Sequence, residues 1–393
     1  MAKAYLRFLL VAFALILSSS CIHGGRNSAR KGTIKTIHST DGDIIDCVDI
    51  YKQPAFDHPL LKNHKIQIEL GFIPSQWNQE KQESVVRQTW HESGECPEGT
   101  IPIRRSTTST PVRRSSTSTP VRRSTSSLVS SPFPYSIQPN FSFRGEPYEY
   151  AVAFENHAMY RGASAKLNVW NPRTNENERS SAQIWLVAGY IENINTVEVG
   201  WAVDPERYGD HKTRLFVYWT TTSYRQGCFD LECPGFVQLS PKYALGTDLH
   251  PLSSYEGPQY EINIFIIQNL QTGNWYLKFQ DVILGYWPGS LMQAMKNGAA
   301  GVQWGGQVTN LRSGDRHTTT QMGSGYFTPG GFQKASFVKK MEVISNGVVR
   351  DPENIDTQVS NVFCYDLHVA IRNDDNGFYF YYGGPGYGTA CTS

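Results

Sequence analysis

The chain has 393 residues, a formal net charge of +1, 18% charged residues, and 21 Tyr, 19 Phe and 9 Trp. Its length leaves room for two or three domains, and its nearly balanced charge excludes the global basic field that nucleic-acid binding requires. Many aromatic residues with few charged ones favour β architecture and disfavour long helices or disorder.

The first 24 residues have the features of a secretory signal peptide. Lys3 and Arg7 form a positive region, residues 8–17 are apolar, and small residues at 18–21 suit cleavage. The apolar run is too short to span a bilayer, and no later run of 18 apolar residues exists. We therefore expect a secreted mature chain without a membrane anchor; an uncleaved signal anchor is the alternative.

The cysteines left after signal removal are even in number, as in a disulfide framework of an oxidising compartment. They are Cys47, Cys96, Cys228, Cys233, Cys364 and Cys391. The simplest scheme joins neighbours, Cys47 with Cys96, Cys228 with Cys233, and Cys364 with Cys391, although six cysteines allow fifteen pairings. A zinc site is the alternative, but no Cys-x2-Cys pair or histidine stands at ligand spacing. We expect no metal and no cofactor.

Two segments precede the main domain. Residues 25–100 form a compact unit in which prolines at 54 and 59 interrupt regular structure. Residues 101–135 contain a nine-residue repeat of Pro, Arg, Ser and Thr that cannot bury a core, so we predict a disordered linker. Its Arg-Arg pairs at 104–105, 113–114 and 122–123 invite proteolysis, with a plain spacer as the alternative. Asn140, in Asn-Phe-Ser, is a predicted glycosylation site.

Residues 140–393 alternate between strand patterns and turn residues. We predict strands near residues 148–154, 163–171, 181–190, 194–203, 213–222, 260–269, 273–285, 301–309, 335–345, 361–371 and 377–383. The one expected helix covers residues 289–297. This pattern predicts an all-β fold, an antiparallel two-sheet β-sandwich, preceded by a small α+β or β-rich domain.

Two of these strands each carry one acid or amide beside a glycine. Val197, Val199 and Trp201 share one face of residues 194–203, so Glu198 lies on the other face beside Gly200. Residues 301–309 repeat the pattern with Gln307 beside Gly305. If the two strands are neighbours, Glu198 and Gln307 face one cleft; a solvent-facing Glu198 is the alternative. We predict that the cleft is lined by Gly200, Trp201, Trp304, Gly305 and Gly306.

Seven ordered motifs resemble the neprosin domain family. They are Tyr-Arg-Gly-Ala-Ser-Ala-Lys-Leu-Asn-Val-Trp-Asn-Pro at 160–172, Val-Glu-Val-Gly-Trp at 197–201, Arg-Leu-Phe-Val-Tyr-Trp-Thr at 214–220, Gly-Cys-Phe-Asp-Leu-Glu-Cys at 227–233, Val-Gln-Trp-Gly-Gly-Gln-Val at 302–308, Thr-Gln-Met-Gly-Ser-Gly at 320–325 and Tyr-Tyr-Gly-Gly-Pro at 381–385. Gln-Pro-Ala-Phe-Asp-His-Pro at 53–59 and Gly-Thr-Ile-Pro-Ile-Arg-Arg at 99–105 are similar to the family's activation peptide.

This resemblance implies a secreted plant glutamic peptidase that cleaves after proline and is made as an inactive precursor. It implies two catalytic glutamates, of which one matches Glu198 and the other is replaced here by Gln307. Gln307 can donate an amide N–H but cannot transfer a proton. The expected outcomes are a non-catalytic protein that binds proline-rich chains, or a Glu/Gln pair like that of the fungal glutamic peptidases. A glycan-binding sandwich is a third possibility.

The resemblance also sets the expected partners and location. We expect a proline-containing peptide or protein as substrate, the chain's own propeptide bound in cis, and no nucleic acid. We further expect a monomer located outside the cell, in the apoplast or cell wall.

Overall fold

The computed structural model describes residues 29–71, 74, 77, 85–106, 148–190, 193–221, 226–311, 316–369 and 372–392. The predicted signal peptide, Asn140 and the linker beyond residue 106 lie outside the described residues. No helix in the described part is long and apolar enough to cross a bilayer.

The N-terminal domain is a three-stranded antiparallel sheet in the order β1-β2-β3. Its strands are β1 (Thr33–His38), β2 (Ile44–Asp49) and β3 (Thr100–Arg104). Short 3-10 helices connect them: η1 (Ile50–Lys52), η2 (Pro54–Asp57), η3 (Pro59–Leu61) and η4 (Thr89–Ser93). The predicted linker start at residue 101 is therefore wrong, because Ile101 and Ile103 are buried and pair with β2.

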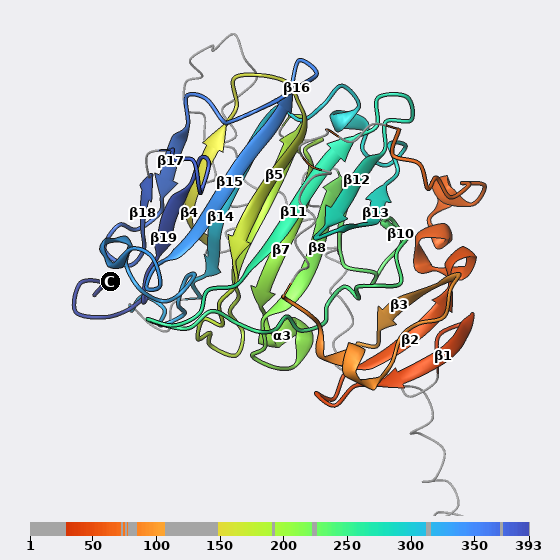
Figure 1. Cartoon of the computed structure of the whole chain (residues 1–393), viewed down its shortest axis with the longest axis horizontal. Helices are drawn as coiled ribbons and strands as arrows, with labels where there is room; N and C mark the ends of the chain where they lie inside the picture. Colours follow the sequence, from red (N-terminus) through yellow and green to blue (C-terminus); the bar gives the residue numbers. More distant parts are fainter. Residues whose placement is uncertain are drawn as a thin grey trace, which may run out of the picture.

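The remaining chain forms two antiparallel sheets packed face to face, which confirms the predicted sandwich (Figure 1). One sheet has the order β17-β4-β14-β6-β7-β8-β9. Its strands are β4 (Tyr148–Glu155), β6 (Ser180–Ala188), β7 (Asn195–Val203), β8 (Arg214–Thr221), β9 (Gln226–Phe229), β14 (Gly301–Thr309) and β17 (Asp356–Val359).

The other sheet has the order β10-β13-β12-β11-β5-β15-β19-β18, with β16 paired to β15. Its strands are β5 (Tyr160–Asn168), β10 (Val237–Gln238), β11 (Glu261–Gln268), β12 (Trp275–Phe279), β13 (Val282–Trp287), β15 (Ser336–Ser345), β16 (Val348–Arg350), β18 (Asp366–Val369) and β19 (Phe380–Gly383). We refer to these two as the seven-stranded and nine-stranded sheets.

Two elements differ from the sequence prediction. The strand predicted at 273–285 is the hairpin β12–β13, whose turn places Gln280 at φ 53°. The helix predicted at 289–297 is a single 3-10 turn, η6 (Gln293–Met295). Nine residues are too few to hold a helix without tertiary support. Here the inter-sheet core buries Leu291, Met292 and Met295 without an α-helix, and Met295 ends the 3-10 turn.

Three smaller features complete the sandwich. The helix α3 (Pro205–Tyr208) was not predicted, although Asp204 caps it and Pro205 opens it. A 3-10 turn, η7 (Thr328–Gly330), precedes β15. The three predicted disulfides are confirmed, with Cα–Cα distances of 5.4 Å for Cys47–Cys96, 5.9 Å for Cys228–Cys233 and 4.8 Å for Cys364–Cys391.

A buried ion cluster joins the N-terminal domain to the sandwich. Asp43 accepts from Arg214 Nη1 of β8 at 2.6 Å and from Arg104 Nε of β3 at 2.7 Å. Arg214 is 0% and Asp43 4% exposed. Arg105 pairs with Asp46 at 2.6 Å within the N-terminal domain. The first Arg-Arg pair is thus paired within the fold, which disfavours it as a processing site.

Candidate functional site

Glu198 and Gln307 lie on the outer face of the seven-stranded sheet, the face turned away from the inter-sheet core. Val197 and Val199 flank Glu198 and belong to that core, as does Val308 beside Gln307. The two strands are not neighbours, because β6 lies between β7 and β14. Glu198 is opposite Trp185 of β6, whereas Gln307 is opposite Ser181, so the two side chains stand at the ends of a diagonal.

Gln183 of β6 occupies the middle of that diagonal. It is opposite Gly200 on one side and Gly305 on the other, which makes it the diagonal neighbour of both Glu198 and Gln307. Its Nε2 donates to Glu198 Oε2 at 2.7 Å. Diagonal neighbours in a sheet are about 7–8 Å apart at the backbone, within the reach of long side chains. Of these two glutamines, Gln183 is the one that donates a hydrogen bond to Glu198, whereas Gln307 donates to Tyr150.

The orientation of the Gln183 amide is set by its other contacts. Its Oε1 accepts from Ser181 Oγ at 2.9 Å and from Arg179 Nη2 at 3.3 Å. Because both partners are donors, the amide nitrogen must point towards Glu198. The Arg179 guanidinium also lies over the Phe216 ring, 4.3 Å from its centroid. These contacts prearrange an N–H donor beside a buried carboxylate.

The two glycines opposite Gln183 each stand close to the backbone of a neighbouring strand, Gly200 to β6 and Gly305 to β4. A Cβ on Gly200 would lie 1.9 Å from the Ala182 backbone oxygen and 2.7 Å from the Gln183 Cβ. Gly305 has φ +143°, and a Cβ there would lie 2.3 Å from the Ala151 oxygen. The backbone that approaches Gly200 closely is therefore that of strand β6.

Glu198 is 5% exposed and held by neutral donors. Besides Gln183, Thr196 Oγ1 donates to Glu198 Oε1 at 3.0 Å. On β8, burial and then the charge of Glu198 raise the pKa of the Tyr218 phenol. Hydrogen bonds from neutral donors favour the ionised carboxylate, whereas burial opposes it. Such a carboxylate is placed to accept a proton.

Gln307 is 9% exposed, and its Nε2 donates to Tyr150 Oη of β4 at 3.1 Å. Gln303, in the same row as Glu198, is 6% exposed. Glu198 therefore lies among three amides on the outer face, those of Gln183, Gln303 and Gln307.

Three of the predicted cleft residues face the core. Trp201 and Trp304 are 0% exposed, and their indole nitrogens donate to the backbone oxygens of Asn168 and Ser164. A Cβ on Gly306 would meet Tyr382 and Met322 of the core. The period of two in a strand places these residues opposite the outward ones, so only Gly200 and Gly305 of the predicted set border the site. Gln183 was not among the site residues predicted from the sequence. The signal for it is its position as a polar residue inside the apolar run of β6.

The described residues offer one cluster with metal-ligand atoms, His317 with Cys364 and Cys391. The cysteines are joined in a disulfide and cannot act as thiolates. His317 is bonded to Glu149 Oε2 and the Thr318 oxygen, both at 2.9 Å. This cluster stabilises one end of the sandwich and does not form a metal site.

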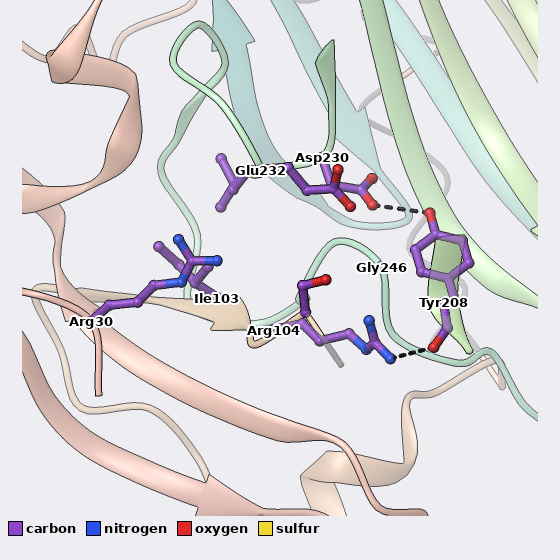
Figure 2. Close-up of a pocket in the computed structure, with 9 residues that line it drawn as sticks. Arg30, Ile103, Arg104, Tyr208, Asp230, Glu232 and Gly246 are labelled. Atoms are coloured by element: carbon purple, nitrogen blue, oxygen red, sulfur yellow. Dashed lines mark hydrogen bonds between the residues drawn. The ribbon is translucent and has the colours of Figure 1, made fainter. Parts of the chain in front are cut away.

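A small cavity lies between the N-terminal domain and the sandwich (Figure 2). Its volume of about 20 Å³ has room for about one water. Asp230 borders the cavity and accepts a hydrogen bond from Tyr208 Oη at 2.9 Å. Arg104 Nη2 donates to the backbone oxygen of Tyr208 at 3.0 Å. Burial and then the charge of Glu232 raise the pKa of Asp230 to about 7. The cavity is too small for an organic ligand.

Comparison with known proteins gives two family matches. The family described as Neprosin matches residues 176–385, and the family described as Neprosin activation peptide matches residues 36–154. Together they cover the N-terminal domain and most of the sandwich.

Solved structures similar to this chain include two peptidases. Scytalido-glutamic peptidase, with a peptide-based transition state analog, has a TM-score of 0.34 and 11% identity over 61% of this chain and 98% of its own. SCP-B, a member of the Eqolisin family in complex with the tripeptide Ala-Ile-His, has a TM-score of 0.32 and 11% sequence identity, and the match covers 61% of this chain and 98% of SCP-B. The β-porphyranase BpGH16B from the human gut bacterium Bacteroides plebeius has a TM-score of 0.20 and 5% sequence identity, and the match covers 40% of this chain and 55% of the porphyranase. At these scores the likenesses add nothing on activity.

Proposed function

Because the chain belongs to the neprosin family, as its motifs predicted, we propose that it is the precursor of a glutamic-type peptidase acting on proline-containing peptides. The N-terminal domain is its activation peptide. The sandwich supplies the reacting groups, and the observation that carries the proposal is the hydrogen bond between buried Glu198 and the oriented amide of Gln183.

Peptide hydrolysis needs a base, a stabilised oxyanion and an acid. Glu198 takes a proton from water, and the resulting hydroxide forms a bond to the scissile carbonyl carbon. An amide N–H of the diagonal stabilises the oxygen that becomes negative. Protonated Glu198 then returns its proton to the leaving nitrogen as the C–N bond breaks. One carboxylate thus serves as base and as acid.

Gln307 limits this chemistry, because an amide cannot exchange the proton that a second carboxylic acid supplies. General acid–base help is worth about 10²–10⁴-fold in rate. We therefore propose weak peptidase activity, with binding of proline-containing chains unaffected by residue 307. The signal-type N-terminus and the disulfides support an extracellular site of action.

The test uses the purified full chain, cut in the linker, and a quenched fluorescent peptide that contains proline, at pH 2–7. We compare wild type with Glu198→Gln, Gln307→Glu and Gln183→Leu, and use Glu256→Gln as a matched control at an exposed carboxylate paired with Lys334. Slow cleavage that Glu198→Gln abolishes and Gln307→Glu accelerates about 10²-fold or more supports the proposal. Activity only in Gln307→Glu identifies the natural chain as a non-catalytic binder, and no activity in any variant overturns the peptidase assignment.

A further inference from the structure

The part of the activation peptide that contains Leu70 and Trp77 lies on the side of the sandwich opposite Glu198. In β11 of the nine-stranded sheet, Ile264 and Ile266 belong to the inter-sheet core, whereas Phe265 and Ile267 belong to a separate cluster. Trp77 and Leu70 of the activation peptide complete that second cluster. The contact therefore lies on the outer face of the nine-stranded sheet, and the N-terminal segment runs beside β10, β12 and β13 in Figure 1.

Side chains of this face bind the backbone of the activation segment. Tyr276 Oη donates to the backbone oxygens of Gln67 and Glu69 at 3.1 and 3.2 Å. Asn269 Nδ2 donates to the Leu70 oxygen at 2.7 Å. Tyr286 Oη accepts from the Gln67 N–H at 3.1 Å. Contacts to the backbone do not depend on the side chains of the bound segment, so they fit any extended peptide.

Trp77 is the aromatic anchor of this contact. It is 2% exposed, and its ring lies 5.2 Å from that of Phe265. Its indole N–H donates to Glu342, which also accepts from Ser164 Oγ at 3.1 Å. Lys278, 8% exposed, donates to the Trp77 backbone oxygen. The indole, its N–H and its backbone carbonyl are thus each recognised by a different group.

The recess around Trp77 is larger than the indole. A cavity of about 170 Å³ remains beside it, lined by Trp77, Ser164, Ala165, Lys166, Phe265, Lys340 and Glu342. This is several times the share of one water, about 30 Å³, and has room for a further side chain. The lysines and the glutamate give the recess charged groups in addition to its aromatic wall.

Removal of the activation peptide uncovers a continuous apolar surface. Phe265, Ile267, Tyr276, Tyr286 and Ile344 are all 7% exposed or less while the segment is bound. Contiguous exposed apolar patches mark binding sites on soluble proteins.

We propose that this face is a second peptide-binding groove, which after release of the activation peptide takes an extended segment of another polypeptide anchored by a tryptophan or similar aromatic residue. The activation segment occupies it in the precursor. The mature protein then holds partners by a face opposite Glu198. Release of the activation peptide belongs to the proposed function, but the groove itself does not depend on catalysis.

The test measures binding in the full chain and needs no activity. The probe is a fluorescein-labelled peptide with the sequence of residues 64–77, and the control probe carries alanine in place of its tryptophan. Wild type keeps its own segment in the groove and should not bind the probe. The full chain with Leu70→Ala and Trp77→Ala should bind the probe saturably in fluorescence anisotropy. The control probe should bind about a hundredfold more weakly or worse.

A substitution in the groove tests whether the probe binds there or at another part of the protein surface. Tyr276→Phe is added to the chain that carries Leu70→Ala and Trp77→Ala. It removes one hydroxyl and should weaken the affinity for the probe about two- to tenfold. Circular dichroism and the melting temperature confirm that each variant is folded. A folded Leu70→Ala, Trp77→Ala chain that does not bind the probe overturns the proposal. So does equal binding of the two probes, or a Tyr276→Phe variant with unchanged affinity.

Discussion

The free energy of unfolding of Asp230→Asn, measured relative to wild type at the same pH, should be higher at pH 8 than at pH 4. Asp230 is buried between the domains, and its pKa is raised from 3.8 to about 7, first by burial and then by Glu232 (Figure 2). A carboxyl with a raised pKa binds its proton more tightly when folded. Its stabilising contribution is complete below the unfolded pKa and is lost as the pH rises through about 7.

The size of the effect follows from the two pKa values. One pKa unit corresponds to about 1.4 kcal/mol, so the rise from 3.8 to about 7 corresponds to about 4 kcal/mol between pH 4 and pH 8. The Oδ1 of asparagine can still accept from the Val217 N–H, its Nδ2 can donate to Tyr208 Oη, and the amide does not titrate. Between pH 4 and pH 8 the wild type should therefore lose about 4 kcal/mol of stability through Asp230, and the variant should not show this loss.

The assay is urea unfolding of the full chain, with disulfides intact, at pH 4, 6 and 8. The difference between variant and wild type, compared across pH, cancels any constant effect of the substitution on packing. Asp281→Asn is the matched control, because Asp281 is an exposed carboxylate paired with Lys242 and should leave the pH dependence unchanged. Parallel pH profiles for wild type and Asp230→Asn would refute the assigned titration.

Two further substitutions test the framework of the fold, each by urea unfolding. Arg214→Met leaves Asp43 buried with only part of its positive charge partners and should cost about 3–5 kcal/mol. Lys242→Met, at an exposed pair, should cost at most about 1 kcal/mol; equal losses would contradict the interdomain role. Gly200→Ala forces a Cβ against a neighbouring backbone oxygen at 1.9 Å and should cost about 3 kcal/mol. Gly388→Ala, where that Cβ has its nearest neighbour at 3.9 Å, should be nearly neutral.

Local sequence patterns determined much of this protein. Alternation placed Val197 and Val199 in the core and Glu198 on the outer face, because successive strand side chains point to opposite sides. The even number of cysteines and their order in the chain predicted the three disulfides that are present. Seven ordered motifs identified the family that the comparisons confirm. Each of these signals is complete within a short stretch of sequence.

The order of strands within each sheet was decided by the tertiary structure alone. β6 separates β7 from β14, and this brings Gln183 to Glu198 in place of Gln307. Strand order depends on pairings between distant segments, and alternation within one strand contains no information about its neighbour. For the same reason the sequence did not reveal that Trp77 packs against Phe265, 188 positions later in the chain. A side chain's face is a local property, whereas its partner is selected when the whole sandwich packs.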